Sequence, residues 1–380
     1  MAIRNLVGAS AEGPDFYGRK KDIARALVKL KNGNSLLLSA PRRVGKTSFA
    51  KKMIEELEKE GWTGFFMNLE SIYEEGTFIN NFVDLLHSKD GGWSKGMHAF
   101  IEWAKSIKVT YKDLSVTSSG IAVVEDFRRE VKKLIDNPDN GNVLFVFDEV
   151  AVFLRRLEEQ GKGKAEIFLS WMRSLRQECR GKNCWIFCSS NSIENYLSSN
   201  GLNASMNDVL EFELAEMPED EAEGLINELA EGANLTISPE LCKHIIRKIG
   251  QTIPYFIQVL FSAIVDQDPE DGVIGKKHIE IAYDELVKAS SLNTWHERIK
   301  EYKGDADDLK KILTVLCHFP KGKLAEELGS RIPSLTGDTE RLNQLLRMLC
   351  QDGYLIKNSQ KYYAFRSNIL RDYWKDRFII

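Results

Sequence analysis

The sequence lacks the features that mark a membrane protein, a disulfide-rich secreted protein or a metal-binding module. No apolar run approaches the roughly 18 residues of a membrane-spanning helix, and the stretch Met1–Gly18 contains no signal-peptide core. Only six of the 380 residues are cysteine, and they form neither a CxxC pair nor a cluster with histidine at metal-ligand spacing. We therefore expect a soluble, cytoplasmic protein with reduced thiols and no membrane partner.

Charge of one sign is not in excess either. The chain has 52 Lys and Arg against 56 Asp and Glu, a net charge of −4, so any nucleic-acid contact has to be a local basic patch. Hydrophobic residues make up 43% of the sequence, which is enough for packed cores and excludes a mostly disordered chain. A chain of 380 residues predicts two or three domains.

Short apolar runs predict the strands of a parallel sheet in residues 1–215. Four are apolar on both faces, as in strands that helices cover from both sides, and the fifth alternates and is weaker. They are Ser35–Ser39, Gly64–Leu69, Asn142–Phe147, Cys184–Ser189 and Val209–Leu214. Amphipathic stretches between them predict helices at Lys46–Glu60, Thr77–Leu86, Val124–Ile135 and Ala165–Arg180. The alternation predicts an α/β domain with right-handed crossovers.

The segment 107–124 departs from this alternation. It is rich in Thr, Val and Ser, so a β-hairpin insert and an ordered surface loop remain alternative interpretations. A second domain is predicted at 216–302, with helices at Pro218–Ala230, Pro239–Ile249, Pro254–Asp266 and Lys277–Ser290. A third is predicted at 303–380, with helices at Leu309–His318, Leu324–Gly329 and Thr339–Gln351 and a hairpin in Gly353–Phe365. Three helices followed by a hairpin is the order of a winged helix.

The sharpest motif, SAPRRVGKTS at Ser39–Ser48, joins the first predicted strand to the helix after it. It matches the phosphate-binding pattern GxxxxGK(S/T), with Ala40 in place of the first glycine. Backbone N–H groups and the helix N-terminus of such a loop face the phosphates, and Gly45 permits the close approach. Lys46 is placed to reach the β- and γ-phosphates, and Thr47 to ligate Mg²⁺. The predicted nucleotide-binding loop comprises Ala40, Pro41, Arg42, Arg43, Val44, Gly45, Lys46, Thr47 and Ser48, with the Arg42 and Arg43 side chains facing solvent or a partner.

A second motif supports hydrolysis. The run Val143–Glu149 (VLFVFDE) is an apolar strand that ends in two acids. Asp148 is the predicted Mg²⁺ residue, and Glu149 is the predicted catalytic residue that orients the attacking water. A strand that stops at an acidic turn is common by itself, but its pairing with the upstream loop favours the nucleotide site. After the fourth strand, Asn191 is the predicted γ-phosphate sensor, with Ser190 as the alternative and a plain turn cluster as the simpler interpretation.

With these motifs the chain resembles prokaryotic P-loop ATPases of the AAA+/STAND type that end in a winged helix. The element FYGRKKDI resembles the family's FxGRxxEL element beside the adenine, which implies nucleotide contacts for Phe16, Tyr17, Gly18 and Arg19. The turn Gly250–Gln258 resembles the family's GGxPYxxQ turn, with extra spacing before the proline, and implies a nucleotide contact for Pro254. The helix Trp171–Glu178 resembles the family's WLRxLRQE helix.

The resemblance implies an ASCE-class P-loop NTPase with sheet order 5-1-4-3-2, a helical lid and a C-terminal winged helix. ATP and Mg²⁺ would bind between the core and the lid. Hydrolysis would operate a molecular switch that controls homo-oligomer assembly or partner engagement, in signalling or defence. Arg176 is then a catalytic candidate that reaches a neighbouring subunit's nucleotide, and Arg173 is its alternative. Two solvated arginines on an amphipathic helix explain the pair equally well.

The C-terminal region leaves the partner open. Asp305–Ile380 contains 13 Lys and Arg against 10 Asp and Glu, a net of +3. The predicted recognition helix Thr339–Gln351 carries few cations, whereas Lys357 and Lys361 in the hairpin are better placed for phosphate contacts. Duplex DNA and a protein surface therefore remain alternative partners. The alternative function is a DNA-bound AAA+ helper that resembles replication-initiator or transposition ATPases.

Overall fold

The computed structural model describes residues 3–40, 42–88, 120–136, 141–178, 183–189, 193, 196–197 and 200–378. The chain divides into two compact units. The first, which we call the sheet unit, comprises Lys20–Ser39 and Lys46–Leu214. The second, which we call the helical unit, comprises Met1–Arg19, Ala40–Gly45 and Ala215–Ile380.

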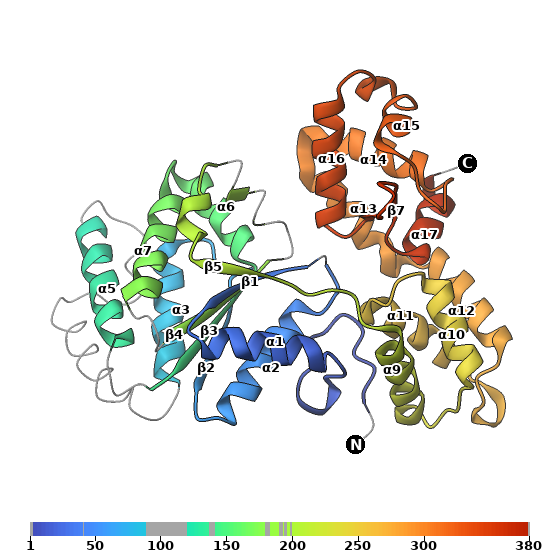
Figure 1. The fold of residues 1–380 in the computed structure, drawn as a ribbon, viewed down its shortest axis with the longest axis horizontal. Coiled ribbons are helices and arrows are strands. Elements are labelled where there is room, and N and C mark those ends of the chain that lie inside the picture. Colours follow the sequence, from blue (N-terminus) through green and yellow to red (C-terminus); the bar gives the residue numbers. More distant parts are fainter. Residues whose placement is uncertain are drawn as a thin grey trace. The chain divides into compact units, whose positions relative to one another are not determined.

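Five parallel strands form the sheet of the sheet unit (Figure 1). They are β1 (Ser35–Ser39), β2 (Thr63–Asn68), β3 (Val143–Asp148), β4 (Asn183–Cys188) and β5 (Val209–Glu213). Their order is β2-β3-β4-β1-β5, which is the predicted order 5-1-4-3-2 counted from the other edge, so the predicted α/β fold is confirmed. Because all pairs are parallel, every strand ends at one edge of the sheet, with Asn68 paired to Asp148 and Leu38 to Cys188.

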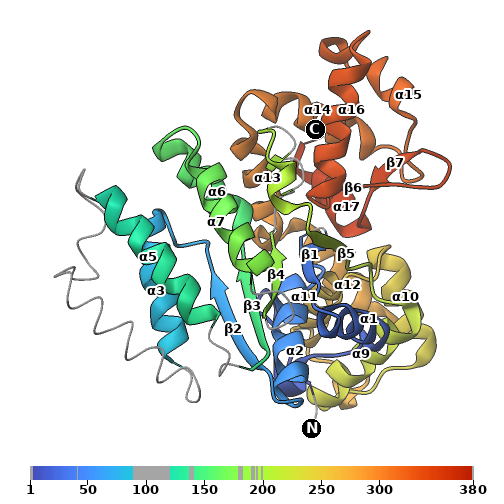
Figure 2. The ribbon, with the colours of Figure 1, turned by 60° about the vertical axis from the view of Figure 1, so that its left-hand side comes forward.

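Helices cover both faces of this sheet (Figure 2). One face carries α1 (Lys20–Lys31) and α2 (Lys46–Glu58), and the other carries α3 (Glu75–His87), α5 (Gly120–Ile135), α6 (Val150–Gln160) and α7 (Lys164–Glu178). The contact between α2 and β2 needs a glycine, because a Cβ on Gly64 would lie 2.2 Å from Cγ2 of Ile54. Burial from both sides explains why the strands of this sheet are apolar runs without alternation.

Aromatic side chains fill the face that α3, α5, α6 and α7 cover. Trp185 of β4 stacks on Phe145 of β3 with ring centroids 4.3 Å apart, and Phe145 stacks on Phe65 of β2 at 5.3 Å. Phe82 of α3 meets Phe145 edge-on at 5.5 Å. Each of these buried rings contributes about 2 kcal/mol to the free energy of unfolding. The packing holds β2, β3 and β4 in register, and with them the residues at their carboxyl ends.

The helix α5 begins earlier than the sequence pattern indicates. Its first residue is Gly120, whereas the prediction began at Val124, so the end of the proposed 107–124 insert belongs to this helix. Residues 107–119 lie outside the described residues, and the hairpin stays a prediction. Four helices were not predicted, namely α1, α6, α13 (Asn293–Ile299) and α17 (Asn368–Phe378), whose apolar spacing becomes evident only beside the elements they cover.

The helical unit is built from short helices. They are α9 (Glu219–Gly232), α10 (Pro239–Ile249), α11 (Pro254–Val265), α12 (Lys276–Lys288) and α13 (Asn293–Ile299), followed by α14 (Ala306–Leu316), α15 (Ala325–Gly329), α16 (Thr339–Gln351) and α17. Short 3-10 turns of this unit lie at Gly13–Asp15, Glu270–Gly272, Ser290–Leu292, Lys300–Asp305 and Pro333–Leu335, and one of the sheet unit lies at Asn203–Met206. The helices α10 and α11 begin at the predicted Pro239 and Pro254, whereas α9 begins at Glu219, one residue after the predicted Pro218. Proline fits the first turn because it has no N–H that needs an acceptor.

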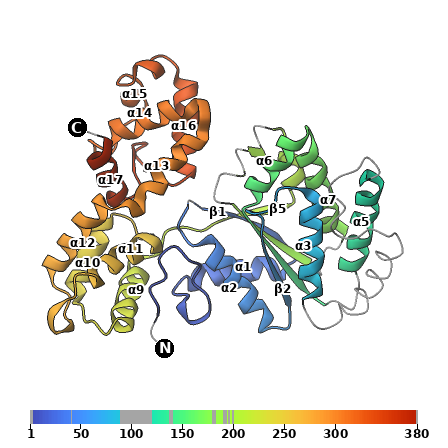
Figure 3. The ribbon, with the colours of Figure 1, turned by 180° about the vertical axis from the view of Figure 1, so that it is seen from behind.

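The last helices pack together at the C-terminal end of the helical unit (Figure 3), where a short hairpin joins them (Figure 2). The hairpin consists of β6 (Leu355–Lys357) and β7 (Tyr363–Phe365), and an isolated bridge joins Lys323 to Tyr363. The Tyr283 hydroxyl of α12 bonds to Oδ2 of Asp372 in α17 at 2.7 Å, and the Tyr354 hydroxyl donates to the Trp295 carbonyl at 2.6 Å. These buried bonds tie the C-terminal elements to α12 and α13.

No single helix among the described residues is long and apolar enough to cross a membrane. The consecutive helices α10 and α11 meet the length and composition test only when they are counted together, and the chain bends by 118° between them.

Candidate functional site

The predicted phosphate-binding residues follow β1 directly. Gly45 has φ of +98°, a backbone conformation that residues with a Cβ atom rarely adopt. Val44, the residue before it, is buried. Lys46 and Thr47 are the first residues of α2. The Lys46 side chain is charged and yet only 7% of the residue is exposed. Burial of an ammonium group at a helix N-terminus, where the dipole is positive, favours an anionic ligand beside it.

Asp148 at the end of β3 meets Thr47 at the start of α2. The Thr47 hydroxyl donates to Oδ2 of Asp148 at 2.5 Å, and the backbone N–H of Glu149 donates to Oδ1 at 3.0 Å. Burial raises the pKa of Asp148 above its ordinary value; the charge of Glu149 adds to this increase, whereas the Thr47 bond and the charge of Lys46 oppose it. The two predicted metal residues are thus in contact.

Oxygen donors at this point fit a magnesium ion. Mg²⁺ takes hydroxyl and carboxylate oxygens, and in nucleotide sites it uses one or two protein ligands together with phosphate oxygens and waters. Thr47 and Asp148 supply two such oxygens. Among the described residues, no group of three or more His, Cys, Asp or Glu could hold a metal by itself. Two protein oxygens are the number that a Mg²⁺ site completed by phosphate oxygens and waters uses.

Glu149 stands at the turn between β3 and α6. Its backbone is left-handed, with φ of 58° and ψ of 37°, and it occupies the N-cap position of α6. This conformation costs a non-glycine residue roughly 1 kcal/mol or more. The turn places Glu149 next to Asp148 at the carboxyl edge of the sheet, and backbone strain of this kind clusters at functional sites.

The tip of β4 leads into Ser189, the first residue of the cluster Ser189–Asn191 in which Asn191 is the predicted sensor. Ser189 is 6% exposed, and its hydroxyl has no hydrogen-bond partner among the described residues. Beside it, burial raises the pKa of the Cys188 thiol; the charges of Asp148 and Glu149 add to this increase and the charge of Lys46 opposes it. The β4 tip therefore lies within the electrostatic reach of the motif residues. Asn191 and its alternative Ser190 lie outside the described residues.

Arg19 joins three segments of the helical unit. Its guanidinium donates to the Ala215 carbonyl at 2.6 Å and to the Val44 carbonyl at 3.0 Å, and its backbone N–H donates to Oε2 of Glu221 at 2.6 Å. Arg19 is 4% exposed and has φ of 60°. Gly18 before it has φ of 72°, and a Cβ there would lie 2.6 Å from Oε2 of Glu221. Arg19 thus fixes the backbone of the loop at Val44 through this hydrogen bond.

Phe16 and Tyr17 precede this arginine. The Tyr17 hydroxyl lies where a Cβ on Gly224 of α9 would be, at 2.0 Å, so the tyrosine packs closely on that helix. Burial raises the pKa of Tyr17, and nearby carboxylates, Glu228 first, add to the increase. Phe16 is half-buried. Tyr17 therefore packs on α9 within the helical unit.

Arg43 lies on an aromatic ring of the helical unit. Its guanidinium carbon is 4.4 Å from the Tyr255 ring centroid, and its φ is 67°. This half-buried side chain, which was predicted to face solvent or a partner, thus has one face on Tyr255, the residue after Pro254 at the start of α11. Pro41 lies outside the described residues, and Ala40, Arg42 and Ser48 all have partners.

Arg176 is held inside the sheet unit. Its Nε and Nη2 donate to the two carboxylate oxygens of Asp208, both at 2.9 Å, and Nη2 also donates to the Ser205 carbonyl at 2.8 Å. The residue is 4% exposed. Arg173 is half-buried and donates to the Ala204 carbonyl at 2.8 Å. A contact of Arg176 with another subunit would require the loss of this bidentate pair, so its surroundings favour a structural role.

Comparisons with known proteins bear on the fold. No protein-family model matches the sequence, and no curated protein matches it. The chain is similar to the Walker-type ATPase PABY2304 of Pyrococcus abyssi, with a TM-score of 0.66 and 13% identity over 98% of this chain and 99% of that chain. It is also similar to the Aeropyrum pernix ORC2 protein, with a TM-score of 0.57 and 13% identity over 98% of this chain and 96% of that chain. With the sheet order, these likenesses define the α/β fold of P-loop AAA+ ATPases.

Proposed function

We propose that this protein binds and hydrolyses ATP with Mg²⁺ and acts as a STAND/AAA+-like molecular switch. The observation that carries the proposal is the 2.5 Å bond between Thr47 and Asp148 beside buried Lys46, at the carboxyl edge of a 2-3-4-1-5 sheet. The similar ORC2 protein was solved as ADPNP-ADP complexes, and PABY2304 is described as a Walker-type ATPase, which supports a nucleotide as the ligand. The preference for ATP over GTP rests on the family resemblance.

Each side chain of the motifs has a separate role in this proposal. Thr47 and Asp148 would hold the metal, which supplies charge neutralisation on the phosphates when it is bound. Lys46 places its ammonium at the phosphates, and Gly45 lets the backbone N–H groups of the loop face them. Glu149 is suited to accept a proton from a water and orient it, because it follows the metal residue directly.

A substitution at Lys46 tests the nucleotide site. Lys46→Ala should weaken binding of a fluorescent ATP analogue by roughly 30-fold or more, because a buried charge-assisted contact to phosphate is lost. Lys59→Ala is the matched control, since Lys59 follows α2 on the surface with a 64% exposed side chain. Unchanged affinity in Lys46→Ala, with the melting temperature preserved, would show that the nucleotide site lies elsewhere.

A chain of contacts within the helical unit supports the switch. Arg19 links the Val44 carbonyl of the loop to the Ala215 carbonyl, and the next residue, Glu216, accepts from Nη1 of Arg366 at 3.0 Å. We propose that this path transmits the state of the loop from the core (residues 1–215) through a lid (216–302) to a C-terminal winged helix (303–380). Light scattering with ADP and with a non-hydrolysable ATP analogue tests whether the nucleotide changes the mass, as expected for homo-oligomer assembly or partner engagement.

The path itself is tested by Arg366→Gln. This variant should bind ATP normally and lose the nucleotide-dependent change in mass, whereas the surface control Lys375→Gln should behave as the unaltered protein. If Arg366→Gln assembles like the unaltered protein, the coupling does not pass through Glu216 and Arg366.

A DNA-bound AAA+ helper is the second candidate. The observation that favours it is the order α14, α15, α16 and the β6–β7 hairpin, which is that of a winged helix, with Lys357 and Lys361 on the hairpin. Fluorescence anisotropy with labelled duplex DNA should then show affinity that falls steeply with salt and is reduced in a Lys357→Gln, Lys361→Gln double variant. A mass change with ATP alone, and no DNA binding, favours the switch.

A further inference from the structure

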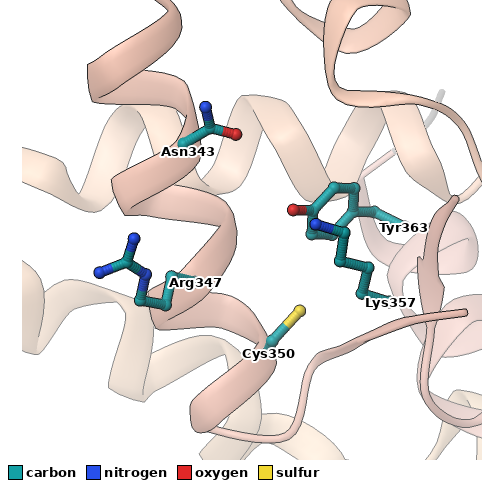
Figure 4. A pocket seen from close by; sticks show the side chains of 5 residues that line it. All are labelled: Asn343, Arg347, Cys350, Lys357 and Tyr363. Atoms are coloured by element: carbon teal, nitrogen blue, oxygen red, sulfur yellow. The ribbon is translucent and has the colours of Figure 1, made fainter. Parts of the chain in front are cut away.

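A pocket of about 420 Å³ between α16 and the β6–β7 hairpin is lined partly by exposed side chains. Its lining residues are Asn343, Arg347, Cys350, Lys357 and Tyr363 (Figure 4). In Figure 4 the Arg347 side chain points away from Lys357, and both residues are exposed. The two cations therefore do not converge on one ligand, and this face remains the surface already considered for duplex DNA. A more enclosed cation, Arg43, lies in the loop between β1 and α2.

The loop between β1 and α2 (Ala40–Gly45) is fastened to the helical unit. Its residues belong to that unit by their contacts, whereas Lys46 and the rest of α2 belong to the sheet unit. The Val44 carbonyl accepts from Arg19, and the side chain of Arg43, one residue earlier, lies on Tyr255. Two consecutive residues of the loop are thus held, one by its backbone and the other by its side chain.

The Arg43 side chain touches two parts of the helical unit. Its guanidinium carbon lies 4.4 Å from the Tyr255 ring centroid, and its Nη1 lies 3.5 Å from the position that a Cβ on Gly8 would occupy. The segment that contains Gly8 is itself bound to α11, because Nδ2 of Asn5 donates to the Gln258 carbonyl at 3.0 Å. A guanidinium is attracted to the face of an aromatic ring, and the attraction is stronger where water is partly excluded.

Tyr255 is a rigid support for this contact. The residue is 7% exposed, and its ring meets Phe256 edge-on with ring centroids 5.4 Å apart. Phe256 in turn stacks on Trp295 of α13 at 6.0 Å. Burial raises the pKa of the Tyr255 hydroxyl and the charge of Arg43 opposes this, so the ring is uncharged at pH 7. A ring packed in this way has a fixed position, and it fixes the guanidinium in turn.

The backbone conformation of Arg43 gives the contact its consequence. Arg43 has φ of 67°, which a residue with a Cβ adopts only where its surroundings hold it there. Gly45, two residues further on, has φ of 98°. These dihedral angles direct the backbone N–H groups that would face a phosphate. Release of the Arg43 side chain would let the loop adopt other conformations, in which these groups no longer point the same way.

We propose that Arg43 is a positioning residue for the nucleotide, because its contact with Tyr255 holds the loop in the conformation that binds phosphate and thereby slows nucleotide release. This role rests on the proposed function, since it requires a nucleotide in the loop. A preorganised loop gains affinity mainly through slower dissociation. The alternative role, a direct contact of the guanidinium with a phosphate, would not involve Tyr255.

The dissociation rate of a fluorescent ADP analogue, bound with Mg²⁺ and displaced by unlabelled ADP, tests this role. Arg43→Gln and Tyr255→Leu should each speed release about tenfold, through the loss of one partly buried cation–π contact. The double variant should release no faster than either single variant, because both substitutions remove the same contact. Tyr255→Phe keeps the ring and should release the analogue at the rate of the unaltered protein.

The matched control is Tyr73→Leu. It removes the ring of another arginine–tyrosine contact, in which the Arg156 guanidinium carbon lies 4.0 Å from the centroid of a 60% exposed tyrosine, and it should leave the release rate unchanged. Circular dichroism melting curves show whether each variant is folded. Tyr255→Met, which fills the space with a flexible apolar side chain, replaces Tyr255→Leu if leucine prevents folding.

The outcomes separate the possible roles of Arg43. Equal release rates in Arg43→Gln, Tyr255→Leu and the unaltered protein overturn the proposal. Faster release in Arg43→Gln alone also overturns it, and assigns the guanidinium to direct contact with the ligand. An unaltered protein that retains no labelled ADP overturns the proposed function itself, and the role of Arg43 with it.

Discussion

Thr47 and Asp148 stand 101 residues apart in the sequence, and the hydroxyl of the first donates to the carboxylate of the second at 2.5 Å. The contact exists because β1 and β3 are parallel strands of one sheet, separated only by β4, so that Asp148 at the carboxyl end of β3 meets the start of α2, the helix that follows β1. The fold itself thus brings together the Thr47 hydroxyl and the Asp148 carboxylate, two oxygen groups of the kind that ligate Mg²⁺.

The first prediction concerns the charge of Asp148. Asp148→Asn keeps an oxygen that accepts from Thr47 and removes a buried carboxylate, so we expect loss of Mg²⁺-dependent nucleotide binding. Because burial raises the pKa of Asp148, its ionisation destabilises the metal-free fold as pH rises through that pKa. The variant should therefore be more stable than the unaltered protein at neutral pH without metal, as measured by urea denaturation. Equal or lower stability would contradict the stated burial effect.

The second prediction separates binding from hydrolysis at Glu149. Glu149→Gln should retain ATP and lower the rate of phosphate release by about a hundredfold or more, since loss of a general base has that magnitude. Glu159→Gln, on the exposed side of the same helix α6, is the matched control and should hydrolyse normally. Normal turnover in Glu149→Gln would remove Glu149 from the catalytic assignment.

The third prediction distinguishes the side chain of Arg19 from its backbone. Arg19→Ala should destabilise the fold by about 3 kcal/mol, because two bonds from a buried guanidinium to carbonyl oxygens are lost. Arg19→Gly loses the same bonds and relieves the left-handed backbone, so it should be more stable than Arg19→Ala by about 1 kcal/mol. Denaturant titration of both variants checks the order. If alanine is the more stable of the two, the φ of 60° is not retained in solution.

The fourth prediction concerns the Arg176–Asp208 pair. Burial tends to raise the pKa of Asp208, and the hydrogen bonds and charge of Arg176 overcome this and lower it below 3.8. A lowered pKa stabilises the fold above the ordinary pKa, and the contribution is lost as pH falls through the folded value. Arg176→Ala should cost about 3 kcal/mol at pH 7 by leaving a partly buried carboxylate unpaired.

The pH profile of this pair provides the control. Asp208→Asn should flatten the loss of stability below about pH 4 that the unaltered protein shows. If Arg176 acts on a neighbouring subunit instead, Arg176→Ala will leave stability unchanged and reduce hydrolysis only in the assembled protein. Urea titrations at two pH values and a hydrolysis assay at two protein concentrations decide between these outcomes.

Much of the sheet unit could be predicted because its signals are local. Apolar runs such as Ser35–Ser39 and the segment ending at Asp148 identify strands, since a strand covered on both faces has no polar side to show. The loop before Lys46 is defined by residue types at fixed spacing, and backbone chemistry explains each of them. The start of α5 was misplaced because Gly120 carries no periodic signal of its own.

Contacts between distant segments could not be predicted in the same way. Nothing near Arg19 in the sequence indicates that its guanidinium donates to Val44 and Ala215. Likewise, Arg176 has the same local pattern as a solvated arginine, and only the approach of Asp208 makes it a buried ion pair. The pairing of a buried charge depends on which segments the fold brings together.

The sequence by itself determined the strands, the sheet order through family resemblance, and the identity of Lys46, Thr47 and Asp148 as motif residues, because these depend on side-chain type and spacing along the chain. Only the tertiary structure decided that Thr47 contacts Asp148, that Arg43 lies on Tyr255, and that Arg347 and Lys357 line a pocket. Such contacts arise where packing of the core and turns with positive φ orient side chains, and neither is encoded in a local run of residues.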